Sequence, residues 1–169
     1  KTIQETVEKT LQRILQEKVK VIGSGRTDSG VHALAQAANF KTHSKLSPAK
    51  IQAALNALLP EDIAIKKVSE VNADFHASYS ARSKAYRYFI LNHRFPSAFL
   101  RKFSWHIPYK LNLKLMQKEA RVLAGRHNFR AFCASGSTAN TTTRTIQNIA
   151  IKTINYPLPA IPACPAGRR

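Results

Sequence analysis

Acidic side chains are scarce in this sequence. Of its 169 residues, Asp and Glu account for 9, whereas Lys and Arg account for 27, and the formal net charge is +18. A surplus of this size indicates an anionic partner, which is nucleic acid, an anionic membrane or an acidic protein. A structural RNA-binding protein would show the same balance, so charge alone does not indicate an enzyme.

Several other features are missing. Two cysteines are too few for a disulfide framework and favour a reducing compartment. No apolar run approaches the roughly 20 residues that span a bilayer, so we expect no membrane partner. None of the six histidines pairs with another His or Cys at helical ligand spacing, which predicts no metal site. The third glycine of a dinucleotide fingerprint and the Gly-Lys-Ser/Thr of a phosphate-binding loop are also absent.

Enough apolar residues are present, at 44%, to build a core. Helical spacing and capping residues predict three helices, over residues 3–17, from Ser47-Pro48 to Pro60, and from Asn112 to Gly125. Strand-like runs occupy residues 19–22, 34–42, 63–68, 82–92 and 141–152. The order of these elements favours an α+β fold whose sheets are covered on one face.

We expect two sheet-plus-helix subdomains that flank a basic cleft. The first, residues 1–77, carries an isolated carboxylate on a loop, and the second, residues 78–153, is an incomplete α+β subdomain. Residues 154–169 contain four prolines, which suit neither a sheet ladder nor a helix interior, and we expect this tail to be disordered.

That isolated carboxylate is Asp28, which is the only acidic residue between Glu17 and Glu61. Three glycines lie close to it in sequence, and Arg26 precedes it by two residues. A guanidinium beside the carboxylate would keep it ionised by lowering its pKa by about 1 to 3 units, which suits a nucleophile or a base. The alternative is an Asx turn, in which the side chain bonds only to its own loop backbone.

Two tyrosines lie in the strand-like run over residues 82–92. Strand alternation places Tyr86 and Tyr88 on the same face as Arg82 and Lys84. Ordinary packing on a sheet would explain these rings. Stacking on nucleobases, at about 1–3 kcal/mol per base, would explain both the rings and the neighbouring cations.

Several blocks together resemble the TruA family of tRNA pseudouridine synthases. Residues 25–33 read GRTDSGVHA, close to the signature Gly-Arg-Thr-Asp-Ala-Gly-Val-His of the family. Phe75-His76-Ala77 followed by SARSKAYRY over residues 80–88 is similar to its second block. Residues 125–132 and 143–146 are similar to later, weaker blocks, so the resemblance runs from about residue 2 to residue 152.

The resemblance implies isomerisation of uridine to pseudouridine in the anticodon arm of tRNA, with no cofactor. It makes Asp28 the catalytic aspartate, Arg26 a group that handles the extruded nucleotide, and Tyr86 the ring that stacks on the target base. Further RNA contacts are expected from the side chains of Arg82, Lys84, Tyr88, His32 and Arg144. A homodimer and a cytoplasmic or organellar location are also implied.

The sequence departs from the family pattern near both ends. It has no match to an opening strand with Tyr-Asp-Gly and Gly-Trp-Gln, nor to a later Met-Val-Arg segment whose arginine reaches the catalytic aspartate. It also starts at Lys1, directly at a helix signal. We therefore expect a chain truncated at both ends. The alternative to an enzyme is an inactive homologue that only binds RNA.

Overall fold

The computed structural model describes residues 2–133 and 141–154, and these form two compact units. The first unit ends at Tyr88 and the second begins at Phe89. The division into folding subdomains after residue 77 stays a prediction. The tail expected to be disordered lies outside the described residues, apart from Ile154. Helices and short two-stranded sheets are both present, in agreement with the predicted α+β class.

The first unit opens with helix α1, Ile3–Leu15. The helix starts where the sequence predicts it, because the Thr2 hydroxyl accepts a hydrogen bond from the Glu5 amide at 3.1 Å. It ends two residues earlier than predicted. Gln16 adopts a left-handed conformation with φ 55°, and its backbone N–H bonds to the carbonyl oxygen of Gln12.

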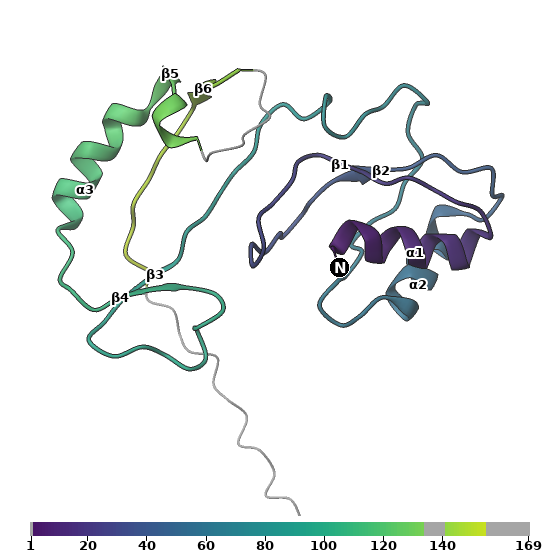
Figure 1. Cartoon of the computed structure of the whole chain (residues 1–169), viewed down its shortest axis with the longest axis horizontal. Coiled ribbons are helices and arrows are strands. Elements are labelled where there is room, and N and C mark those ends of the chain that lie inside the picture. The colour runs from purple at the N-terminus through teal and green to yellow at the C-terminus, as the bar shows by residue number, and fades with distance from the viewer. Residues whose placement is uncertain (1, 134–140, 155–169) are drawn as a thin grey trace, which may run out of the picture. The chain divides into compact units, whose positions relative to one another are not determined.

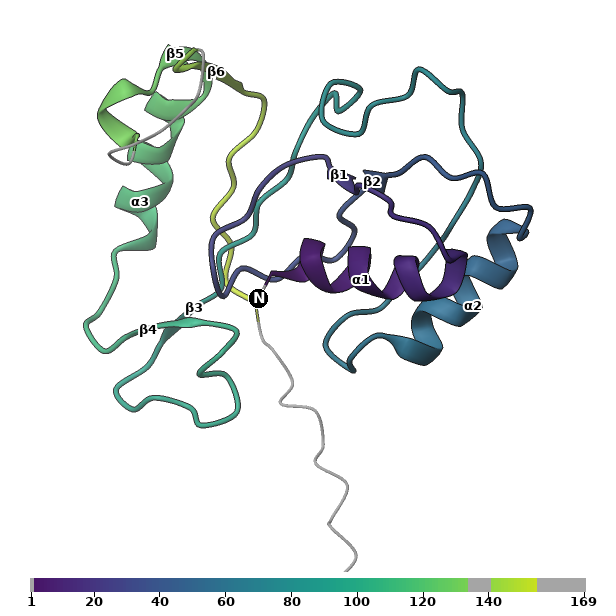
Figure 2. The same ribbon diagram turned by 45° about the vertical axis from the view of Figure 1, so that its right-hand side comes forward.

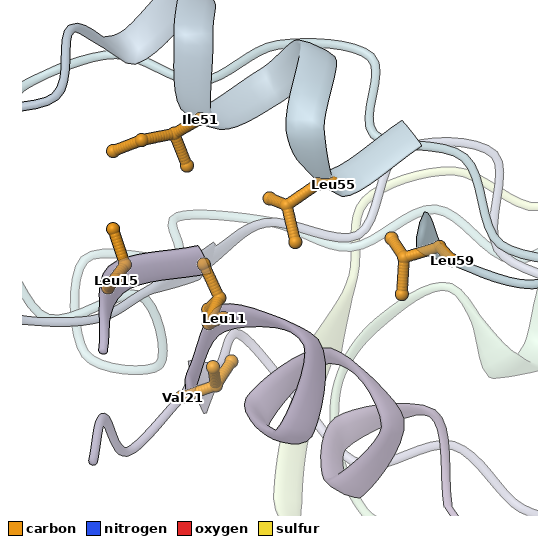
Figure 3. Close-up of a cluster of buried hydrophobic side chains, with 6 residues drawn as sticks. All are labelled: Leu11, Leu15, Val21, Ile51, Leu55 and Leu59. Atoms are coloured by element: carbon orange, nitrogen blue, oxygen red, sulfur yellow. The ribbon is translucent and has the colours of Figure 1, made fainter. Parts of the chain in front are cut away.

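Helix α2, Pro48–Leu58, lies beside α1 (Figures 1 and 2). Its start is also confirmed, since Ser47 accepts from the Lys50 amide and Pro48 occupies the first turn. The two helices and the following chain bury one apolar cluster (Figure 3). Its members are Leu11, Leu15, Val21, Ile51, Leu55 and Leu59.

Strands in the first unit are shorter than the sequence predicts. Strand β1, Ile22–Gly23, pairs antiparallel with β2, Ala38–Asn39, and Ile22 lies opposite Asn39. The predicted strand over residues 63–68 is wrong, because side chains of α2 take the place of a neighbouring strand. Asn56 accepts from the Ile65 amide at 2.7 Å and donates to its carbonyl oxygen at 2.9 Å.

The second unit contains two further strand pairs and a helix. Strand β3, Ile90–Asn92, runs parallel to β4, Trp105–Ile107, and β5, Gly125–Asn128, pairs antiparallel with β6, Thr143–Ile146. Helix α3, Leu113–Ala120, is capped by the Asn112 side chain, as predicted, and continues into the 3₁₀ turn Arg121–Leu123. A second 3₁₀ turn spans Arg130–Phe132.

The buried core lies entirely in the first unit among the described residues. Described residues of the second unit are all exposed or half-buried, and large rings such as Trp105, at 67% exposure, and Phe132, at 74%, face solvent. The predicted strand over residues 82–92 is confirmed only for its last three residues.

Within residues 2–133 and 141–154, no helix combines the length and apolar character that crossing a bilayer requires.

Candidate functional site

The glycine-containing block forms a long loop between β1 and β2. The base of this loop is closed by two hydrogen bonds within the first unit. The Ser24 amide donates to the Ala37 carbonyl oxygen at 2.8 Å, and the Gln36 side-chain amide donates to the Gly25 carbonyl oxygen at 2.5 Å. The loop is therefore held at its two ends, while the residues from Arg26 to Ala38 are exposed.

Asp28 starts a tight turn at the far end of this loop. Its carbonyl oxygen accepts a hydrogen bond from the Val31 amide at 3.2 Å. Gly30 has φ +83°, in the left-handed region that glycine adopts without the steric cost of a side chain. The turn over Asp-Ser-Gly-Val thus fixes the backbone position of Asp28.

The expected pairing of Asp28 with the Arg26 guanidinium is not present in this structure. Both side chains are exposed, and no ion pair or side-chain hydrogen bond of Asp28 occurs within the described ranges. The Asx-turn alternative is therefore not observed either. The reason is that residues 26–38 of the loop are all exposed, so neither charge is shielded from solvent. The catalytic role of Asp28 stays a prediction.

The second sequence block lies beside this loop. The Ala77 amide donates to the Asn39 side-chain oxygen at 2.8 Å, and Ala77 is 2% exposed, so the block is anchored next to β2. A turn closed by the Ser80 amide and the His76 carbonyl oxygen then redirects the chain. As a result Lys84 lies against Gly25, although the two residues are far apart in sequence.

Other predicted site residues are not gathered into one arrangement. Tyr86 is 69% and Tyr88 86% exposed, and Arg82 is exposed. Because residues 82–88 form no strand, the shared strand face expected for these side chains is wrong. His32 is exposed on the loop.

Arg144 belongs to the second unit, on β6. Its guanidinium donates to the Thr141 hydroxyl at 3.0 Å and to the Thr143 carbonyl oxygen at 2.7 Å. These bonds are local and hold the side chain along its own strand. Its predicted contact with RNA stays a prediction.

Gln36 is a positioning residue that the sequence reasoning missed. Its amide fixes the carbonyl group of Gly25 and so the start of the loop that carries Asp28. A signal was available, because Gln36 is the only polar residue between Ala33 and Ala38. A single amide in such a run is a candidate for a structural hydrogen bond.

Within the described ranges no group of three or more His, Cys, Asp or Glu side chains could hold a metal ion.

Comparison with known proteins finds similarity to one family. Residues 1–80 match the model of a family described as tRNA pseudouridine synthase. Proteins named tRNA pseudouridine synthase A are similar over most of the chain. The one from Thermoanaerobacter sp. (strain X514) is 46% identical over 151 residues, and the one from Acetivibrio thermocellus is 47% identical over 152 residues. The one from Caldicellulosiruptor saccharolyticus is 49% identical over 146 residues.

These alignments cover 89%, 90% and 86% of this chain, respectively. The chain is similar over most of its length to proteins of the tRNA pseudouridine synthase family. It spans 62% of the length of the first two relatives and 60% of the third.

Proposed function

We propose that this chain isomerises uridine to pseudouridine in tRNA, with Asp28 as the catalytic carboxylate. The observation that carries the proposal is the 46% identity to proteins named tRNA pseudouridine synthase A, over an alignment that covers 89% of the chain. The net charge of +18 suits a polyanionic substrate. The close approach of Lys84 to Gly25 supports a common site for the two blocks.

The reaction breaks the N1–C1′ glycosidic bond of uridine and joins C5 to C1′, while C5 loses a proton and N1 gains one, so atoms and electrons balance without a cofactor. An ionised Asp28 can attack C1′, or it can remove a sugar proton to give a glycal. Both routes need the target nucleotide to leave its stack, at a cost of a few kcal/mol. The anticodon arm offers such nucleotides at its loop, where bases unstack most easily.

The exposure of Asp28 and Tyr86 fits a site that the RNA itself completes. An extruded uridine would place its base against the exposed Tyr86 ring and its ribose near Asp28, so that bound RNA excludes water from the reacting atoms. Arg26 would contact the extruded nucleotide. Arg82, Tyr88, His32 and Arg144 would contact the rest of the RNA. The homodimer and the cytoplasmic location also stay predictions.

Conversion of an unmodified tRNA transcript tests the proposal. The purified chain is incubated with the transcript, and pseudouridine is located by carbodiimide treatment and primer extension. We expect conversion in the anticodon arm by the parent protein. The isosteric change Asp28→Asn should lower the rate by at least about 100-fold, because it removes the reacting charge.

The matched control is Asp62→Asn, which removes one exposed carboxylate of the same unit outside the loop. It should convert the transcript like the parent. Equal rates for Asp28→Asn and Asp62→Asn would refute the assignment of Asp28. Salt-sensitive binding of the transcript without any product would instead support the RNA-binding alternative.

A further inference from the structure

A hollow lies beside the glycine loop in the first unit. Its volume is about 240 Å³. It is lined by both ends of the loop and by the second sequence block, through Ser24, Ala35, Ala37, Phe75, Ala77, Ser80, Ala81, Ser83 and Lys84. Most of these side chains are small, so none of them fills the hollow. Three carry hydroxyl groups and one carries a positive charge.

The ammonium group of Lys84 lies directly over Gly25. A methyl group placed on the Gly25 Cα would lie 2.5 Å from Lys84 Nζ and 3.4 Å from its Cε. The first distance is shorter than carbon and nitrogen tolerate, so the lysine can hold this position only because residue 25 has no side chain. Gly25 does not have a positive φ, so the need for glycine here is a matter of space.

This ammonium has no partner among the described residues. No ion pair or hydrogen bond of Lys84 occurs within residues 2–133 and 141–154. The carbonyl oxygen of Gly25 bonds instead to the Gln36 amide. The acidic side chain in the neighbouring hollow, Asp74, lines a separate space that shares Phe75 and Ser80 with this one. Lys84 is exposed and lines the hollow together with three serines, so its charge is accessible to an anion that enters the hollow.

We propose that this hollow is a subsite for one phosphate group of an RNA backbone, with Lys84 as its cation and Gly25 as the residue that makes room for it. The choice of RNA rests on the proposed function. A lysine ammonium binds phosphate as a point charge, and the hydroxyl groups of Ser24, Ser80 and Ser83 can add hydrogen bonds. Occupancy would tie the bound strand to the loop that carries Asp28.

Binding of a labelled tRNA transcript, measured by fluorescence anisotropy between about 50 and 200 mM salt, tests the subsite. Lys84→Met should lower the slope of log affinity against log salt by about 0.7–0.9, the value of one lost phosphate contact. The matched control is Lys50→Met, an equal loss of charge on the exposed surface of α2. It should change the slope much less.

Gly25→Ala makes the test specific. This change leaves the net charge unaltered, yet its methyl group should displace the Lys84 ammonium from Gly25. It should lower the salt slope by less than Lys84→Met does, because the flexible end of the lysine can shift at little cost. In the Lys84→Met background, Gly25→Ala should have no further effect, because the group that it displaces is already gone. Far-UV circular dichroism of each variant verifies that the fold is retained.

Two results would overturn the subsite. One is a Lys84→Met slope equal to that of Lys50→Met, and the other is an effect of Gly25→Ala that persists when Lys84 is absent. Titration with inorganic phosphate, followed by the amide NMR signals of Ser24, Gly25 and Lys84, provides a second readout that needs neither tRNA nor activity. Movement of these signals on addition of phosphate supports the subsite. Signals that stay unchanged through the whole titration count against it.

The outcomes for the subsite and for the proposed function can be separated. A chain that shows the Lys84-dependent slope but makes no pseudouridine retains the subsite and loses the proposed activity. A chain that makes pseudouridine while Lys84→Met and Lys50→Met bind alike retains the activity and loses the subsite.

Discussion

Replacing Leu11 by alanine should destabilise the first unit severely. Leu11, on α1, is 0% exposed and packs with side chains of α2 and with Val21 in the only buried apolar cluster among the described residues (Figure 3). The substitution removes three carbons, and at about 0.8 kcal/mol each the transfer term is about 2.4 kcal/mol. The cavity left behind raises the expected loss to about 3–5 kcal/mol.

That loss is large for a unit of this size. At about 0.05–0.15 kcal/mol per residue, the unit that ends at Tyr88 has a total stability of about 4–13 kcal/mol. Urea unfolding followed by far-UV circular dichroism measures the change. The signal reports chiefly on the first unit, since α1 and α2 have 13 and 11 residues and α3 has 8.

Leu58→Ala is the matched control, because Leu58 is in α2 but is 45% exposed. It should cost less than about 1 kcal/mol. A difference between the two variants smaller than about 1 kcal/mol would refute the packing described for α1 and α2.

Two further predictions concern acid stability and the Asp28 turn. The first unit should lose stability as the pH falls below 4.5, the ordinary pKa of glutamate, because folding lowers the pKa of two glutamates. The pKa of Glu8 is lowered chiefly by its hydrogen bond from the Gln4 amide. The pKa of Glu17 is lowered chiefly by its hydrogen bond from the Thr42 hydroxyl. A lowered pKa stabilises the fold above the unfolded value, and this contribution is lost as the pH drops through the folded value. Urea titrations at several pH values should show a shallower loss for Glu17→Gln than for the parent, and parallel pH curves would contradict the reasoning. Gly30→Ala should cost about 1–2 kcal/mol through its positive φ alone, since no atom lies within 4 Å of the added carbon. An unchanged urea midpoint would show that this turn is not populated in solution.

The helices could be predicted from the sequence because their signals are local. Thr2, Ser47 and Asn112 each accept a hydrogen bond from an amide in the first turn of the helix that they precede. Such caps act within three residues, so a linear pattern contains all the information needed. The end of α1 was less certain, because a left-handed Gln16 is not signalled by residue type.

The strands were overpredicted because strand formation depends on a partner. Residues 63–68 are rich in Ile and Val, yet side-chain amides of α2 bond their backbone in place of a strand. Residues 82–88 alternate as a strand would, yet they are exposed and belong to no strand of the described chain. Strand propensity reflects packing against neighbours, and those neighbours cannot be read from the segment itself.

The candidate site also contains features that the sequence predicted and features that only the folded structure shows. The sequence singled out Asp28 and Lys84 as separate features, and it predicted a pairing of Asp28 with Arg26 that the structure does not contain. The contact of Lys84 with Gly25 could not be foreseen, because it requires Asn39 to anchor Ala77 beside β2. Gln36 stood out in the sequence as a single amide in an apolar run, but its hydrogen bond to the Gly25 carbonyl oxygen became visible only in the folded loop.

The amino-acid order alone determined the helix boundaries at their starts, the basic charge and the family motifs, because each is a property of neighbouring residues or of composition. Tertiary structure alone decided which strands form, that Asp28 faces solvent, and that an unpaired ammonium rests on a glycine. These properties depend on segments far apart in the chain meeting in space, where burial and hydrogen bonding select among local preferences.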